Sequence, residues 1–427
     1  MVGFRGWRRA ARERLRRRLN RAPRHYMYSR EGMVQVVIAL AAVASVLGGC
    51  SSVERTLSTT VPAYASLPNG RDPINPDEES ALGKRFSKGL FRTLQDQHAR
   101  PLNILEISGG GPYGAFGSGV LVGWAETGTR PKFDIVTGIS AGALLSTFAF
   151  LGEPEDDAVI ADLFTGMKKD DVSPKAGGVL RFVFGDNSLM DNKPLIERLQ
   201  KLITVKTLDR VAAEARKGRL LFVGLVNLDY RQLWAFDLTG LAASGEADAV
   251  DTYRKILLAS VSPPLIFPPV EINGSLFADG GTRDRLLVAG LGGREAGSSS
   301  PATSDGGTFY VLFNDQAHSV ARAIKPDIKG VISSALQTMM GANMEATLLG
   351  AYVAAQANGF EFKLMNIPDS VQLGRDSLAF DPEIMKVLFE KGRELGRNPS
   401  SWVAAPSPGQ NASPWLIKLL SELRRER

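Results

Sequence analysis

Twice within fifty residues, a short apolar segment leads directly into a glycine-rich turn and then into an apolar helix. The first apolar segment is residues 103–107, and it is followed by three consecutive glycines and a helical pattern over 116–126. The second is residues 133–137, and it is followed by a turn at 138–142 and a helical pattern over 143–151. This alternation of strand, tight turn and helix predicts an α/β fold with a mostly parallel sheet, whose binding sites lie beyond the carboxyl ends of the strands.

Charge is distributed unevenly along the 427 residues. The formal net charge is +6, but residues 1–49 hold eleven arginines and only two acids, so the rest of the chain carries about −3. A mildly acidic body has no electrostatic footprint for nucleic acid. We therefore exclude nucleic acid as a partner and treat the basic segment separately from the fold.

The N-terminal segment has the features of an export signal. Its arginine-rich part precedes an apolar run at 33–47, which is short for a membrane span of about 20 residues, and the run ends at Leu47-Gly48-Gly49-Cys50. This tetrapeptide resembles the lipobox of bacterial lipoproteins, in which the cysteine becomes the lipidated first residue. The resemblance implies removal of residues 1–49 and a lipid anchor on Cys50 in the bacterial cell envelope, at the outer membrane facing the periplasm. An uncleaved anchor or a free thiol at Cys50 is the alternative.

Composition divides the remaining chain into three parts. We expect a polar tether at 50–79, one α/β hydrolytic domain at 80–400, and a linker with a C-terminal helix at 401–427. Residues 152–210 are polar and irregular and could form a cap over the site. Further strands are expected at 220–226, 232–238, 270–272, 275–278 and 308–313, and further helices at 79–97, 251–261, 331–355 and 381–396.

The second glycine-rich turn places Ser140 in the pattern G-x-S-x-G, between Gly138 and Gly142. In a nucleophile elbow, these glycines leave room for a strained turn that presents the serine hydroxyl above the sheet edge. The pattern alone is weak, but here a strand ends just before it and a helix begins as it closes, so backbone amides lie beside the hydroxyl. We predict Ser140 as a nucleophile; a glycine-rich turn that serves only close packing is the alternative.

The first glycine-rich turn supplies candidate donors for an oxyanion, namely the amides of Gly109, Gly110 and Gly111. With Gly114, this turn also matches the G-x-G-x-x-G fingerprint of dinucleotide-binding proteins, and Asp134 lies twenty residues further on. However, Asp134 opens the next apolar strand, whereas a ribose-binding acid should lie at the carboxyl end of that strand. A dinucleotide-dependent enzyme therefore stays as an alternative function.

The base must come from one of few side chains. The chain has three histidines: His25 in the targeting segment, and His98 and His318 outside any recognisable catalytic turn. A carboxylate can serve a serine directly if its site is desolvated. Asp279 ends an apolar strand and is followed by two glycines, whereas Asp305 has the same neighbours within a low-complexity loop. We favour Asp279 as the base.

The glycine-rich turn at 109–114, the serine elbow at 138–142 and the Asp-Gly-Gly turn at 279–281 resemble, in this order, the patatin-like phospholipase family. The resemblance covers about residues 102–320. It implies a Ser-Asp dyad on a three-layer α/β/α fold with a mostly parallel central sheet, hydrolysing acyl esters of phospholipids or other lipids. The family usually has Lys or Arg where this chain has Tyr113. The missing cation makes phospholipids less favoured as substrates than uncharged esters.

We thus predict a serine acyl-ester hydrolase with a lipid or other acyl-ester substrate, a membrane anchor, and neither a cofactor nor a metal. A dinucleotide-dependent enzyme and a non-catalytic envelope lipoprotein are the two alternatives from other classes.

Overall fold

The computed structural model describes residues 64–66, 100–166, 190–287, 307–317, 344–373 and 380–406, together with single positions between 324 and 338. All of these residues belong to one unit of the chain. The export signal with Cys50, the three histidines, Asp305 and the helices expected at 79–97 and in 401–427 lie outside the described residues.

Nine strands in this part of the chain form one mixed sheet in the order β1-β5-β4-β3-β2-β8-β9, and the β6–β7 hairpin pairs with β4. Five neighbouring strands, from β4 to β9 in this order, are parallel, and β5 returns antiparallel beside β4. The strands are β1 (Ala65–Ser66), β2 (Leu102–Ile107), β3 (Ile135–Ile139), β4 (Leu220–Asn227), β5 (Gln232–Asp237), β6 (Val270–Ile272), β7 (Ser275–Asp279), β8 (Gly307–Phe313) and β9 (Phe360–Asn366).

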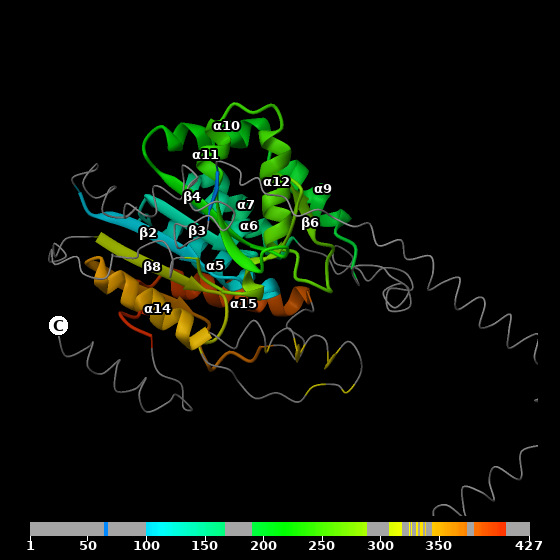
Figure 1. Ribbon diagram of the computed structural model, residues 1–427. Helices are drawn as coiled ribbons and strands as arrows, with labels where there is room; N and C mark the ends of the chain where they lie inside the picture. Colours follow the sequence, from blue (N-terminus) through cyan, green and yellow to red (C-terminus); the bar gives the residue numbers. More distant parts are fainter. Residues whose placement is uncertain are drawn as a thin grey trace, which may run out of the picture. The chain divides into compact units, whose positions relative to one another are not determined.

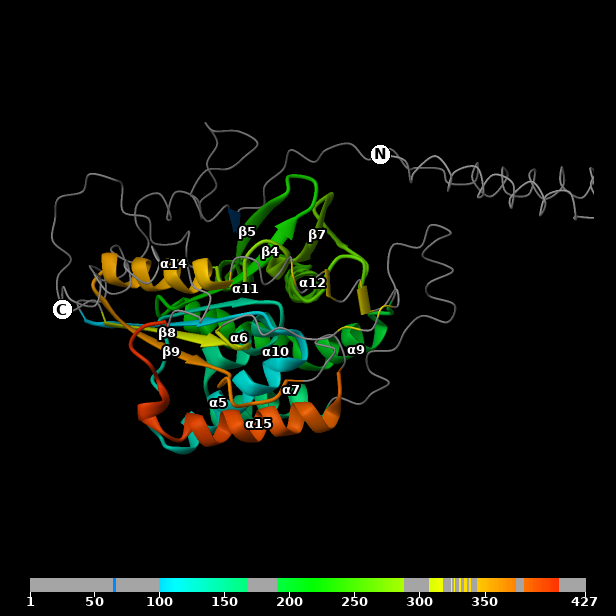
Figure 2. The same ribbon diagram turned by 90° about the horizontal axis from the view of Figure 1, so that it is seen from below.

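Helices cover both faces of the sheet (Figures 1 and 2). Figure 2 shows α14 on one side of the strands and α5 and α15 on the other. The α-helices are α5 (Gly114–Glu126), α6 (Ala141–Leu151), α7 (Pro154–Thr165), α9 (Lys193–Leu202), α10 (Val205–Ala215), α11 (Leu238–Ala243), α12 (Ala249–Ser260), α14 (Met344–Ala357) and α15 (Pro382–Gly396).

Two hydrophobic clusters, one on each face of the sheet, form the core. Strand β2 shows why: Ile104 packs in the cluster with Leu348 of α14, while its neighbour Leu105 packs in the cluster with Phe116 of α5. Successive side chains of a strand point to opposite faces, so strands that are apolar on both faces require helices on both sides. The expected three-layer α/β/α fold with a mostly parallel sheet is confirmed.

The structure also differs from the expectations in three places. Residues Ala65–Ser66, expected in the tether, pair with β5 as the edge strand β1, and a strand of two residues is too short to leave a periodic signal. Strand β9 was not expected, although Phe360, Phe362 and Leu364 alternate in the pattern of a strand. The described parts of 152–210 are helical, as α7, α9 and most of α10.

Candidate active site

Ser140 lies in a strained turn between β3 and α6. Its backbone has φ 55° and ψ −124°, a conformation that a residue with a side chain adopts only at a cost. The turn leaves no room for side chains beside it: a Cβ on Gly142 would lie 2.2 Å from the carbonyl oxygen of Ile107, and one on Gly138 would lie 2.5 Å from that of Gly142. These two glycines therefore make the elbow sterically possible.

The hydroxyl of Ser140 donates a hydrogen bond of 2.6 Å to Oδ2 of Asp279. Both residues are buried, and the side chain of Asp279 also accepts a bond of 2.8 Å at Oδ1 from the amide of Gly281. Burial raises the pKa of Asp279 from 3.8 to about 7, although the bonds from Ser140 and Gly281 and the charge of Arg285 oppose the rise. The structure thus brings together a serine and a carboxylate whose basicity is increased by desolvation.

The strands place Asp279 beside the elbow across a separation of 139 residues. Strand β7 runs antiparallel to β4, with Asp279 opposite Leu225, and the amide of Asp279 donates to the carbonyl of Ser262 at 3.0 Å. The hydroxyl of Ser260 accepts from the amide of Ser140 at 3.0 Å and donates to the carbonyl of Gly224 at 2.9 Å. The end of α12 and the residues after it therefore hold both Ser140 and Asp279 in place, through Ser260, a serine that no sequence motif indicates.

The glycine-rich turn after β2 lies against the elbow. A Cβ on Gly109 would lie 3.1 Å from Cβ of Ser140 and 3.8 Å from its Oγ, and Gly111 lines the same pocket as Ser140. Among the described residues, no hydrogen bond is made by the amides of Gly109 and Gly110. Gly109 and Gly111, two of the three glycines predicted to donate to an oxyanion, therefore lie against Ser140 or in the wall of its pocket.

Asn314, directly after β8, holds this turn in place. Its Oδ1 accepts from the amide of Gly117 at 2.9 Å, its Nδ2 donates to the carbonyl of Ser108 at 2.8 Å, and its own amide donates to Ser108 Oγ at 2.8 Å. Ser108 Oγ in turn donates to the carbonyl of Gly109 at 2.8 Å. The sequence analysis missed Asn314, because nothing nearby in the sequence relates it to the turn.

A cavity of about 360 Å³ opens beside Ser140. Most of its wall is apolar, whereas charged side chains from α7 and α9 occupy another part of it. The apolar lining comprises Pro112, Ala141, Leu144, Phe164, Met190, Pro194, Leu195, Leu202, Val261, Pro263, Ile266, Phe267 and Phe380, and the charged lining comprises Asp162, Glu197, Arg198 and Lys201. Pockets of about 300–1,000 Å³ with an apolar wall and few polar groups are typical of small-ligand sites.

Asp134, the acid of the dinucleotide alternative, lies at the opposite end of the sheet from this pocket. It precedes β3, and its carboxylate accepts bonds of 2.5 and 3.1 Å from Arg100 and 2.8 Å from the amide of Asn103. The glycine-rich turn instead follows the carboxyl end of β2. This separation argues against a dinucleotide fingerprint that uses both features.

A cluster of metal ligands and a membrane-spanning helix are both absent from the described ranges. In these ranges, no group of three or more His, Cys, Asp or Glu side chains is arranged as metal ligands. Likewise, none of the helices described is long and apolar enough to cross a membrane.

Comparison with known proteins gives one family. Residues 105–291 match the family model for patatin-like phospholipase. Among solved structures, the chain is similar to VipD from Legionella pneumophila at 13% identity and a TM-score of 0.34, over 69% of this chain and 65% of that one, so the match spans less than two thirds of VipD. No curated protein matches the chain. Residues 105–291 are therefore similar to the patatin-like phospholipase family, which confirms the resemblance of this part of the chain to that family.

Proposed function

We propose that this protein is a serine acyl-ester hydrolase in which Ser140 is the nucleophile and Asp279 is its base. The observation that carries the proposal is the 2.6 Å hydrogen bond from Ser140 Oγ to Asp279 Oδ2, at the wall of an apolar pocket. A serine hydroxyl is a weak nucleophile unless an adjacent base takes its proton. The raised pKa of Asp279, about 7, suits a base that works near neutral pH.

In the acylation step, Asp279 accepts the proton of Ser140 as Oγ attacks the carbonyl carbon of the ester. The alcohol then leaves with that proton, and the acyl group stays on Ser140. Water, deprotonated by Asp279, then attacks the acyl-serine. As the bond between Oγ and the acyl carbon breaks, the acid is released and Asp279 returns the proton to Ser140 Oγ. The amides of Gly109, Gly110 and Gly111 are the proposed donors to the oxyanion, and each such donor typically lowers the barrier by about 3 kcal/mol.

The pocket favours an ester with one apolar chain near the reacting carbonyl. Its volume of about 360 Å³ is at the small end for ligand sites, and apolar side chains such as Leu144 and Phe164 form its wall close to the elbow. Tyr113, in the place of the family's usual cation, is buried. We therefore propose lipid acyl esters as the substrate class, with uncharged esters included.

We also propose that the mature protein is anchored by lipid on Cys50 to the outer membrane, facing the periplasm. The apolar run at 33–47 and the tetrapeptide ending at Cys50 support this placement.

Labelling with a fluorophosphonate probe tests the proposed function, because only an activated serine reacts. We expect Ser140→Ala to abolish labelling and ester hydrolysis. The matched control is Ser146→Ala, because Ser146 is a buried serine of α6, the helix that follows Ser140, and donates to the carbonyl of Ala143 at 2.8 Å. This variant should keep both labelling and hydrolysis. Failure of the wild-type protein to react would favour the non-catalytic or dinucleotide-dependent alternative.

A further inference from the structure

Leu265 has a backbone conformation that the rest of the fold does not explain. It is one of four non-glycine residues with positive φ in the described part of the chain, with φ 73°. Ser140 belongs to the elbow, and Arg231 and Asn273 lie in the turns of the β4–β5 and β6–β7 hairpins. A branched, apolar residue is disfavoured in this region, and strained backbone is frequent at functional sites.

The side chain of Leu265 is exposed although the two residues after it are buried. It is 42% exposed, whereas Ile266 and Phe267 are each 7% exposed and line the cavity together with Pro263. The loop is held on both sides: the amides of Ile266 and Phe267 donate to the carbonyl of Pro263, and the carbonyl of Ile266 accepts from Met190 at 2.8 Å. Leu265 is therefore an apolar side chain fixed on the rim of the pocket and directed to solvent.

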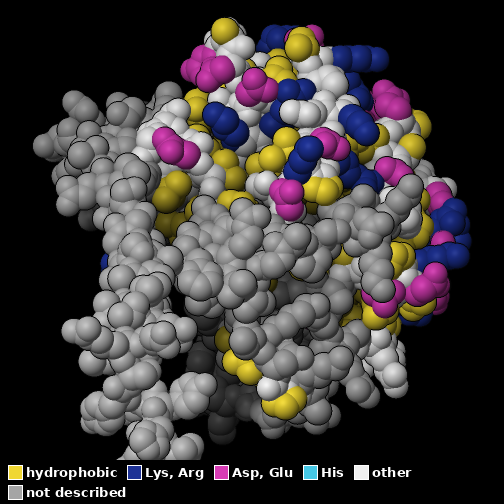
Figure 3. Space-filling model, turned by 90° about the vertical axis from the view of Figure 1, so that its right-hand side faces the viewer, with side chains coloured by type: hydrophobic (Ala, Val, Ile, Leu, Met, Phe, Trp, Pro, Cys, Tyr) yellow, Lys and Arg dark blue, Asp and Glu magenta, His cyan; other side chains and the backbone are white. Residues whose placement is uncertain are grey.

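Helix α9 supplies positive charge to the same rim. It carries Lys193, Arg198 and Lys201 against one acid, Glu197, and Arg198 forms an ion pair of 2.8 Å with Asp162 of α7. Because Asp162 and Glu197 line the cavity together with Arg198 and Lys201, the excess positive charge of α9 rests on Lys193 and Lys201. No ion pair involves Lys201 in the described structure. Figure 3 shows the side of the molecule on which α9 lies in Figure 1, and there Lys and Arg, Asp and Glu, and hydrophobic side chains are interspersed.

We propose that this rim is a docking surface for a lipid membrane: Leu265 inserts among the lipids, and α9 faces anionic head groups. A lipid surface fits both features, because apolar side chains gain free energy in its interface and Lys and Arg are attracted to anionic lipids. Docking in this orientation would place the pocket mouth against the substrate layer. The inference rests on the proposed function only in assigning a lipid ester to the pocket.

A label that senses polarity tests the docking directly. Cys50 is the single cysteine of the chain, so Cys50→Ala with Leu265→Cys leaves one thiol to carry the dye. Val353→Cys, on α14 and 40% exposed, is the matched control on the opposite layer of the fold. On addition of phosphatidylcholine vesicles containing phosphatidylglycerol, we expect a blue-shifted and stronger emission at position 265 and none at 353. No change at 265, or equal changes at both positions, would overturn the proposal.

Activity supplies a second, independent measurement through Leu265→Asn. Asn tolerates positive φ better than Leu, so the variant should fold with unchanged or higher thermal stability. We expect about a tenfold loss of turnover on esters embedded in vesicles, and a change of less than about twofold on a monomeric, water-soluble ester. Equal loss on both substrates, or no loss on either, contradicts a docking role. The dye measurement repeated with Ser140→Ala decides the docking even if no ester is hydrolysed.

Discussion

Asp279 shows how one buried side chain couples chemistry to stability. Its carboxylate is fully buried at the end of β7, where desolvation raises its pKa to about 7 and makes it a stronger base than an exposed aspartate. The same burial costs stability whenever the group is charged. If Asp279 is the base, a rise in pH should therefore increase activity and decrease the stability of the fold.

The pH dependence of kcat/KM should report this coupling. If Asp279 is the base, it must be deprotonated to act, so we expect kcat/KM to rise with pH through an apparent pKa of about 7. The folded state keeps the proton to about pH 7, whereas the unfolded state releases it near pH 4, so the contribution of Asp279 to stability is lost as the pH rises. Relative to Asp279→Asn, the wild type should lose up to about 4 kcal/mol of unfolding free energy between pH 4 and 8. Chemical denaturation of both proteins at several pH values is the measurement. The same difference in unfolding free energy between wild type and variant at every pH would contradict this prediction.

Asp279→Asn should also separate a dyad from a triad. If Asp279 is the only base, the variant should lose several orders of magnitude in kcat, about 10³-fold or more, while His98→Ala and His318→Ala each keep most activity. Asp237→Asn is the matched control, since Asp237 is a buried acid that caps α11 and Asn is an equally good cap. A collapse of turnover in either histidine variant, with circular dichroism unchanged, would show that a triad operates.

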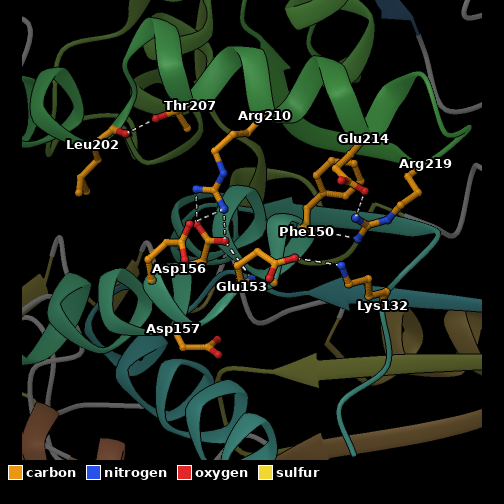
Figure 4. Close-up of polar contacts among 12 residues, drawn as sticks. Lys132, Phe150, Glu153, Asp156, Asp157, Leu202, Thr207, Arg210, Glu214 and Arg219 are labelled. Atoms are coloured by element: carbon orange, nitrogen blue, oxygen red, sulfur yellow. Dashed lines mark hydrogen bonds and ion pairs between the residues drawn. The ribbon is translucent and has the colours of Figure 1, made fainter. Parts of the chain in front are cut away.

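At the scale of elements, two helix pairs are held by different interactions. Helix α10 is attached to α7 by ion pairs, since Arg210 binds the buried Asp156 at 2.9 and 2.6 Å (Figure 4). Helices α5 and α15 instead pack backbone to backbone. A Cβ on Gly119 or Gly123 of α5 would lie 2.0–2.1 Å from carbonyl oxygens of α15, and one on Gly392 would lie 2.1 Å from that of Phe116. Because α5 follows the glycine-rich turn in the chain, the packing of α5 against α15 also positions that turn.

Substitution of a glycine at the contact between α5 and α15 should therefore lower the stability of the fold. We expect Gly392→Ala to lower the free energy of unfolding by about 2–4 kcal/mol, because the two helices must move apart. The matched control is Gly240→Ala in α11, where an added Cβ would meet only the carboxylate of Asp237, at 3.1 Å. Chemical denaturation of both variants is the measurement. Equal free energies of unfolding would show that α5 and α15 can move apart without a loss of stability.

At the scale of the whole molecule, the N-terminal segment should determine where the protein is located. We expect the mature N-terminus to be a lipid-modified Cys50, with Ser51 beside it favouring sorting to the outer membrane of a Gram-negative cell. Cys50→Ala should then accumulate unprocessed in the inner membrane. Mass spectrometry of the N-terminus after membrane fractionation is the test. Wild-type protein in the cytoplasm with residues 1–49 attached would refute the assignment.

The sequence by itself determined the features that depend on local sterics. A strand, a glycine-rich turn and a helix adjacent in the chain limit their own backbone geometry, so the α/β class, the elbow at Ser140 and the candidate Asp279 were predictable without coordinates. Only the tertiary structure decided what depends on distant partners. Pairing of β7 with β4 brings Asp279 to Ser140, and Asn314 reaches the glycine-rich turn from β8. Burial, and with it the basicity of Asp279, exists only when these elements pack and exclude water, which no local pattern encodes.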